Sequence, residues 1–188
     1  MKIRKITFVV LGLIILLGCF VYREQIKHQA IELLIRTGCL MDSERIKQQA
    51  VEMINRGEAD CVVVRANGEW ITEKGRGLSP ILRIYEQHPD AMRGAIVVDK
   101  VIGRAAAMVA IAGQAYSVHG LLMSEDARDL LVWRHAIDAS YGELVPRILN
   151  ANRDGLCPLE QSVEGIDNPK QAIEALKQRI SELSAGAQ

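Results

Sequence analysis

The stretch Arg93–Gln114, RGAIVVDKVIGRAAAMVAIAGQ, decides the fold. Its apolar run Ala95–Val98 predicts a short strand that is buried on both faces. Asp99 follows as a good helix N-cap, and from Lys100 onward the alanines, methionine and isoleucine predict a helix. In open α/β sheets, ligands bind where helices begin at the carboxyl ends of strands. The charged residues Asp99, Lys100 and Arg104 therefore mark a candidate site.

The composition narrows the class of protein. The chain has 188 residues, 49% of them hydrophobic, which allows one domain with a real core plus an appendage. Its 23 basic and 23 acidic side chains cancel, and only 4% of residues are aromatic. Because nucleic-acid binding needs a basic field or stacking side chains, we expect no nucleic-acid partner. The cysteine and histidine spacings contain no metal or disulfide signature, so we expect no metal and no cofactor.

The start of the chain has a different character from the rest. Basic residues precede the uncharged run Ile6–Tyr22, a pattern typical of an uncleaved membrane anchor or a signal segment. We expect a single-pass anchor over residues 1–22 and an amphipathic stalk helix over 23–41, with the side of the membrane undetermined. Lipidation of Cys19 stays open, as does a start at Met41 instead of Met1.

The remaining chain alternates between strand and helix signals. Asn67-Gly68 between two apolar runs is a strong hairpin signal. Ser124 is a good N-cap for the helix that follows it. The expected strands after the hairpin are Ala95–Val98, Tyr116–Met123 and Ile137–Tyr141. The expected helices include Glu44–Asn55, Ile81–Gln87, Glu125–His135, Pro158–Val163 and Lys170–Leu183. A single helical turn is expected within Glu143–Asn150. This order predicts an α/β domain over 42–166 with a mixed sheet of about five strands, then a C-terminal helix and tail over 167–188.

Two further segments hold candidate ligand-binding residues. Arg76 and Gly77 lie in a basic, glycine-containing loop before a helix, where backbone N–H groups and positive charge suit a phosphate or carboxylate. Asn152, Arg153 and Asp154 form a turn signal ahead of the next helix.

Cys157 precedes Pro158 at a helix start, where the pKa of a thiol is lowered. It is a structural cap, a nucleophile or a ligand contact, and the sequence leaves these three open. Glu160 lies three residues further on and can complete a capping box.

Several segments resemble an uncharacterised prokaryotic family, a domain of unknown function in the cytidine deaminase-like superfamily. They are GRGLSPIL (Gly75–Leu82), VVDKVIGRAAA (Val97–Ala107), ELVP (Glu143–Pro146) and NRDGLCPLE (Asn152–Glu160). The resemblance covers about Ser43 to Gly165 and implies a three-layer α/β/α deaminase-like fold. Zinc deaminases use an H-x-E and a P-C-x-x-C motif, whereas Val101 and Arg104 occupy the two cysteine positions here. We therefore do not expect zinc-dependent deaminase activity.

Three function classes follow for the domain. The first is a membrane-tethered module that binds a nucleotide-like or other anionic small molecule. Its expected ligand-binding residues are Arg76, Gly77, Arg104, Asn152, Arg153, Asp154 and Glu160. The second is a metal-independent hydrolase or transferase that uses Cys157, or Asp99 with Lys100. A tethered scaffold with a vestigial pocket is a third class, and a homo-oligomer is compatible with all three.

Overall fold

The computed structural model describes residues 42–88 and 90–185. The chain divides into compact units at 1–45 and 46–188, and the fold below is that of the second unit. No helix among the described residues is long and apolar enough to cross a bilayer. This finding contradicts the expected membrane location and transmembrane helix. The run Ile6–Tyr22, Cys19 and the expected stalk lie outside the described residues.

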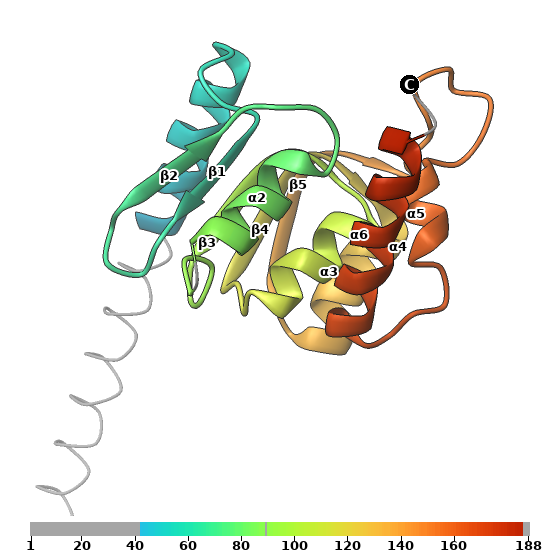
Figure 1. Ribbon diagram of the computed structural model, residues 1–188. Coiled ribbons are helices and arrows are strands. Elements are labelled where there is room, and N and C mark those ends of the chain that lie inside the picture. The colour runs from blue at the N-terminus through green and yellow to red at the C-terminus, as the bar shows by residue number, and fades with distance from the viewer. Residues whose placement is uncertain (1–41, 89, 186–188) are drawn as a thin grey trace, which may run out of the picture. The chain divides into compact units, whose positions relative to one another are not determined.

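A mixed sheet of five strands organises the described part of the chain (Figure 1). The strands are β1 (Cys61–Val64), β2 (Trp70–Glu73), β3 (Ile96–Ile102), β4 (Ser117–Ser124) and β5 (Asp138–Val145). Their spatial order is β2-β1-β3-β4-β5, with β1 antiparallel to both neighbours and β3, β4 and β5 parallel. The expected α/β class with a mixed five-stranded sheet is confirmed.

The helices follow the expected order with shifted boundaries. They are a helix over 42–55, α2 (Ser79–Gln87), α3 (Arg104–Ala112), α4 (Glu125–Asp129), α5 (Pro158–Ser162) and α6 (Pro169–Ala185). A π-helical turn, η1 (Leu130–Arg134), continues α4. The α6 helix packs beside α3, and both are seen in front of the sheet in Figure 1.

The core has two parts because successive strand residues point to opposite faces of the sheet. On one face, Val63, Val97 and Val118 pack with the α2, α3 and α6 side chains. On the other face, the alternate residues Val62 and Val98 pack with Ala50 and Ile54 of the helix over 42–55, and all of these belong to the second unit. The helices therefore cover both faces of the sheet.

Short-range turn and cap signals are confirmed. The hairpin at Asn67-Gly68 joins β1 to β2, with Gly68 at a φ of 85°. The Ser124 side chain accepts a hydrogen bond of 3.2 Å from the Ala127 N–H and caps α4.

The expected strand–helix boundary after Val98 is wrong. Asp99 and Lys100 belong to β3, which continues to Ile102, and the helix N-cap is Gly103. The strand continues because Asp99 lies opposite Cys61 on β1 and Gly120 on β4, so neighbouring strands pair with it on both sides.

The expected helical turn within Glu143–Asn150 is also wrong. Residues up to Val145 form the end of β5, where Glu143 lies opposite Leu122. The parallel ladder with β4 supplies backbone hydrogen bonds that a single isolated helical turn could not match.

Candidate functional site

A cavity of about 540 Å³ lies at the carboxyl ends of two parallel strands, next to Ser124 at the end of β4 and Pro146 after β5. We call it the carboxyl-end cavity. Its other lining residues are Arg104, Glu125, Asp126, Asp129, Arg147, Ile148, Leu156, Glu160, Glu164 and Gly165. Two of the predicted site residues, Arg104 and Glu160, line it. This is the edge at which open α/β sheets bind ligands.

Arg104 is held by internal partners. Its Nε donates to the carbonyl oxygen of Val163 over 3.0 Å, and its Nη2 donates to that of Ile166 over 2.8 Å. Its guanidinium also pairs with Asp126 and Asp167, at 3.1 and 3.2 Å. The side chain is only 11% exposed. Arg104 therefore ties α3 to α4 and to the segment between α5 and α6, instead of presenting a free charge to a ligand.

Glu160 occupies the N-terminal end of α3. Its carboxylate accepts hydrogen bonds from the N–H groups of Arg104, at 2.8 Å, and Ala105, at 3.0 Å. A Cβ on Gly103 would lie 2.4 Å from Glu160 Oε1, so the N-cap position must be glycine for this carboxylate to fit. Burial raises the pKa of Glu160, although the two N–H bonds act in the opposite direction. The expected capping box with Cys157 is wrong, because Glu160 caps α3 and not its own helix.

Asp99 is buried in the sheet and is not a helix cap. Its side chain is beside Cys61, Oδ1 accepts from the Val101 N–H at 3.1 Å, and Oδ2 has no N–H or O–H partner among the described residues. Burial raises the pKa of Asp99 to about 7, and burial also raises the pKa of the Cys61 thiol well above its usual value. Asp99 does not line the carboxyl-end cavity.

Lys100 faces away from Asp99, since neighbouring residues of a strand point to opposite sides. Its ammonium pairs with Asp60, whose other carboxylate oxygen accepts a hydrogen bond of 2.7 Å from the Gly75 N–H. The hydrogen bond from Lys100 holds the pKa of Asp60 below its usual value. The structure therefore does not bring the Asp99 and Lys100 side chains together.

The other predicted residues lie away from the cavity lining. Arg76 and Gly77 are exposed in the loop before α2. Asn152, Arg153 and Asp154 are exposed at the tip of a hairpin-like loop.

That loop is held together by its own contacts. An isolated bridge joins Leu149 and Leu156, and the Asn150 amide donates to Asp154 over 2.7 Å. Cys157 is half-buried at the N-cap of α5, and its side chain makes no cap hydrogen bond.

The residues that sequence reasoning missed follow strand ends. Glu125, Asp126 and Asp129 come from α4 directly after β4, and Arg147 comes two residues after β5. The sequence did contain a signal for these four residues: they follow predicted parallel strands, and the residues after such strands meet at one edge of a sheet. Glu164 follows α5 and is placed there by the tertiary structure. The described residues include no group of three or more His, Cys, Asp or Glu that could hold a metal ion.

A second cavity of about 430 Å³ lies at the opposite edge, near the residues that precede β3 and β4. Its basic side chains are paired: Lys177 with Glu86 at 2.7 Å, and Arg93 with Asp90 at 2.8 Å. The carboxyl-end cavity is therefore the better candidate site.

Comparison with known proteins places the chain in a family. Residues 49–180 match the family model of a domain of unknown function, DUF1893. The fold is similar to the crystal structure of a DUF1893 family protein (TM1506) from Thermotoga maritima, with a TM-score of 0.62 and 24% sequence identity. That similarity covers 70% of this chain and 88% of the other, and at this identity it shows the fold alone. No curated protein matches the sequence. The chain belongs to the DUF1893 family of domains of unknown function.

Proposed function

We propose that this domain binds a small polar molecule in the carboxyl-end cavity. The observation that carries the proposal is the position of a cavity of about 540 Å³, lined mainly by polar side chains, at the ends of β4 and β5. Cavities of several hundred cubic ångströms are typical of small-molecule sites, and ligands of α/β sheets bind at this edge.

Several of the groups expected to hold an anion are already engaged, and Arg76 and Arg153 lie outside the cavity lining. Lys100 pairs with Asp60, Arg104 with carbonyl and carboxylate oxygens, and the first N–H groups of α3 with Glu160. A nucleotide-like anion would have to displace these contacts. The proposal therefore does not require a negatively charged ligand.

We also infer that the fold is related to the cytidine deaminase-like superfamily. The strand order β2-β1-β3-β4-β5, with an antiparallel β1 and parallel β3 to β5, supports this relationship. At the two positions that correspond to the cysteines of the P-C-x-x-C motif, the Val101 side chain is exposed and the Arg104 side chain binds protein oxygens. Zinc-dependent deamination is not part of the proposal.

The competing hypothesis is a metal-independent enzyme built on Cys157, or on Asp99 with Lys100. It requires reacting groups within hydrogen-bonding reach of each other. Asp99 points into the core, Lys100 points to Asp60, and no hydrogen bond among the described residues joins Cys157 to either. The geometry favours binding over this chemistry.

Thermal unfolding of the purified full-length chain tests the proposal. The chain is screened against nucleosides, nucleotides, amino acids, amines and short-chain acids. A ligand at about tenfold over its Kd adds about 1.4 kcal/mol of stability, which raises the Tm by roughly 3–6 °C. Leu156→Trp should fill the cavity and abolish the shift, whereas Leu183→Trp, on the exposed face of α6, should leave it unchanged.

If no compound raises the Tm, the proposed function is wrong. The same conclusion follows if a compound raises the Tm of Leu156→Trp as much as that of the original chain, because binding then occurs elsewhere. Ile148→Trp serves as a second filling variant if Leu156→Trp lowers the Tm of the unliganded chain.

A further inference from the structure

Most charged side chains of the carboxyl-end cavity have protein partners. Arg104 pairs with Asp126, and Asp129 pairs with Arg128 at 2.7 Å. Glu160 accepts two backbone N–H bonds at the start of α3. These contacts stabilise the segments that line the cavity. A charged ligand that bound to the same groups would have to break them.

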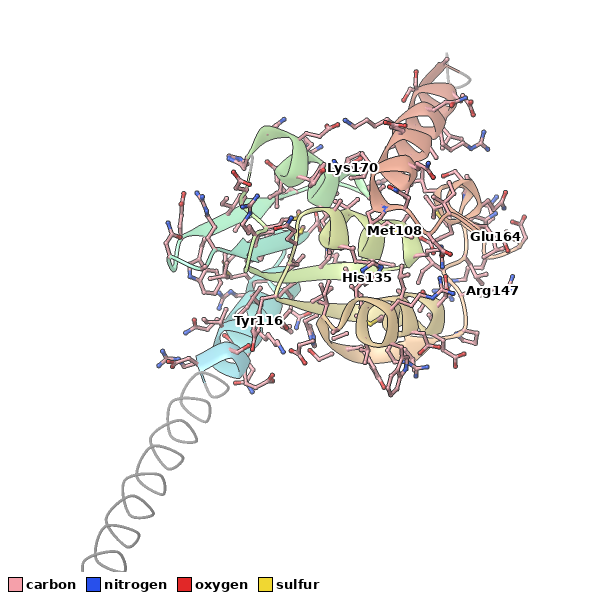
Figure 2. All side chains as sticks on the ribbon, turned by 90° about the horizontal axis from the view of Figure 1, so that it is seen from below. Met108, Tyr116, His135, Arg147, Glu164 and Lys170 are labelled. Carbon is pink, nitrogen blue, oxygen red and sulfur yellow. The ribbon has the colours of Figure 1, made fainter. Side chains whose placement is uncertain are left out.

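Three charged side chains of the cavity have no such partner within the part of the chain that the structure describes. Arg147, Glu125 and Glu164 line the cavity and are exposed, and no hydrogen bond or ion pair joins their side chains to any other described residue. Arg147 and Glu164 are labelled at the same edge of the molecule in Figure 2. They come from different segments, the stretch just after β5 and the turn after α5.

The unpaired charges are of both signs, and they do not pair with each other. The Arg147 guanidinium forms no ion pair with the carboxylate of Glu125 or of Glu164. A guanidinium and two carboxylates therefore border one cavity with a gap between them. A molecule that carries both charges can bridge this gap.

We propose that the ligand of the carboxyl-end cavity is a zwitterion with a carboxylate and an ammonium group, of the amino-acid or short-peptide class. This inference rests on the proposed function. The Arg147 guanidinium offers a planar fork that binds a carboxylate through two hydrogen bonds. Glu125 and Glu164 accept hydrogen bonds from the ammonium. The volume of about 540 Å³ accommodates a molecule of this size.

The charges of the cavity discriminate against simpler ligands. A ligand with only positive charge would leave Arg147 facing a like charge, and a ligand with only negative charge would face Glu125 and Glu164. Like-charge contacts of this kind lower affinity and give specificity. The zwitterion satisfies both sides of the cavity.

Isothermal titration calorimetry of the full-length chain tests this inference. The probes are the twenty standard amino acids and the dipeptides of glycine with each. For the tightest binder, the carboxamide form removes the negative charge, and the N-acetyl form removes the positive charge. We expect each modified form to bind at least about tenfold more weakly than the zwitterion, because each loses a charge-assisted contact.

Variants connect each charge of the ligand to a side chain. Arg147→Gln should weaken binding of the zwitterion about tenfold and leave binding of the carboxamide unchanged. The double variant with Glu125→Gln and Glu164→Gln should weaken the zwitterion and leave the N-acetyl form unchanged. Arg153→Gln, at the exposed tip of the neighbouring loop, is the matched control and should bind as the original chain does. All of these side chains are exposed, so we expect the Tm of the unliganded variants to be unchanged.

The result that overturns the inference is distinct from the one that overturns the proposed function. If a singly charged or neutral compound binds as tightly as any zwitterion, and Leu156→Trp abolishes its binding, the cavity is a binding site and the zwitterion assignment is wrong. If Arg147→Gln leaves the affinity for the zwitterion unchanged, the assignment is also wrong. If no probe in either screen binds, both statements are wrong.

Discussion

Glu160 accepts a hydrogen bond of 2.8 Å from the backbone N–H of Arg104, which lies 56 positions earlier in the chain. A carboxylate from one helix thereby caps another. This contact occupies the N-terminal end of α3, the place at which the sequence predicts an anionic ligand. The candidate site consequently lies in the neighbouring cavity, beyond the ends of β4 and β5.

Removing this carboxylate should weaken the fold. Glu160→Ala leaves two α3 N–H groups without their acceptor, and we expect the free energy of unfolding to fall by about 1–2 kcal/mol. Urea unfolding measures the change. Glu174→Ala, on the exposed side of α6, is the control and should change it by less than about 0.5 kcal/mol. Equal effects of the two variants would contradict the capping role.

Gly103 and Glu160 should be energetically coupled. Gly103→Ala places a Cβ 2.4 Å from the position of Glu160 Oε1 and should displace the carboxylate, at a cost of about 1–3 kcal/mol. In the Glu160→Ala background the clash is gone, and the same substitution should cost clearly less. A double-mutant cycle by urea unfolding measures this difference. Additive effects would show that the glycine is required for another reason.

Arg104→Ala should destabilise the domain more than removal of any exposed arginine. The substitution leaves the Val163 and Ile166 carbonyl groups without their donor and Asp126 without its partner, so we expect a loss of about 3 kcal/mol. Arg104→Lys should restore only part of this loss, since an ammonium cannot reproduce the planar fork. Arg76→Ala, in an exposed loop, is the matched control. Denaturation of the three variants at one pH compares them.

Asp99 should make the stability depend on pH. Its pKa is about 7 in the folded chain and lies at its usual value of 3.8 in the unfolded chain, so the folded state binds more protons between these pH values. The free energy of unfolding should therefore fall through Asp99 as the pH rises from about 4 to 7, by up to about 1.4 kcal/mol per unit.

Asp99→Asn removes this ionisation. The difference in unfolding free energy between the variant and the original chain should grow in favour of the variant from pH 4 to 7, then stay constant. Urea unfolding at intervals across pH 4–8 measures it, and other titrating groups cancel in the difference. Parallel curves for the two proteins would show that folding does not raise the pKa of Asp99.

The two described cysteines should differ in reactivity. Cys61 is fully buried and its thiol has a raised pKa, whereas Cys157 is half-buried. Iodoacetamide should label Cys157 of the native full-length chain faster than Cys61, as followed by peptide mass spectrometry. In urea the two rates should converge. Faster labelling of Cys61 in the native chain would contradict its position in the core.

Local signals in the sequence predict most of the fold. Asn67-Gly68 predicts the hairpin because a tight turn needs a residue that adopts a positive φ angle, as Gly68 does. Ser124 predicts a helix start because its side chain bonds to the N–H three positions later. The alternation of apolar runs predicts the α/β class and the number of strands. These features depend on interactions within a few residues of each other.

Local signals could not predict that strand β3 continues through Asp99. An aspartate after an apolar run is usually a cap, and only pairing with β1 and β4 keeps it in the strand. The end of β5 was missed for the same reason, since its ladder partner is another segment of the chain.

The sequence by itself determined the fold class, the hairpin, the cap of α4 and the edge of the sheet at which a site should lie. Only the tertiary structure decided which charges remain available there. It pairs Lys100 with Asp60, binds Arg104 to the α5–α6 segment and leaves Arg147 and Glu164 at one cavity without a partner among the described residues. The physical reason is the separation in sequence of the interacting residues. Turns and caps involve residues a few positions apart, whereas the partner of a charged side chain comes from a segment that meets it only after folding.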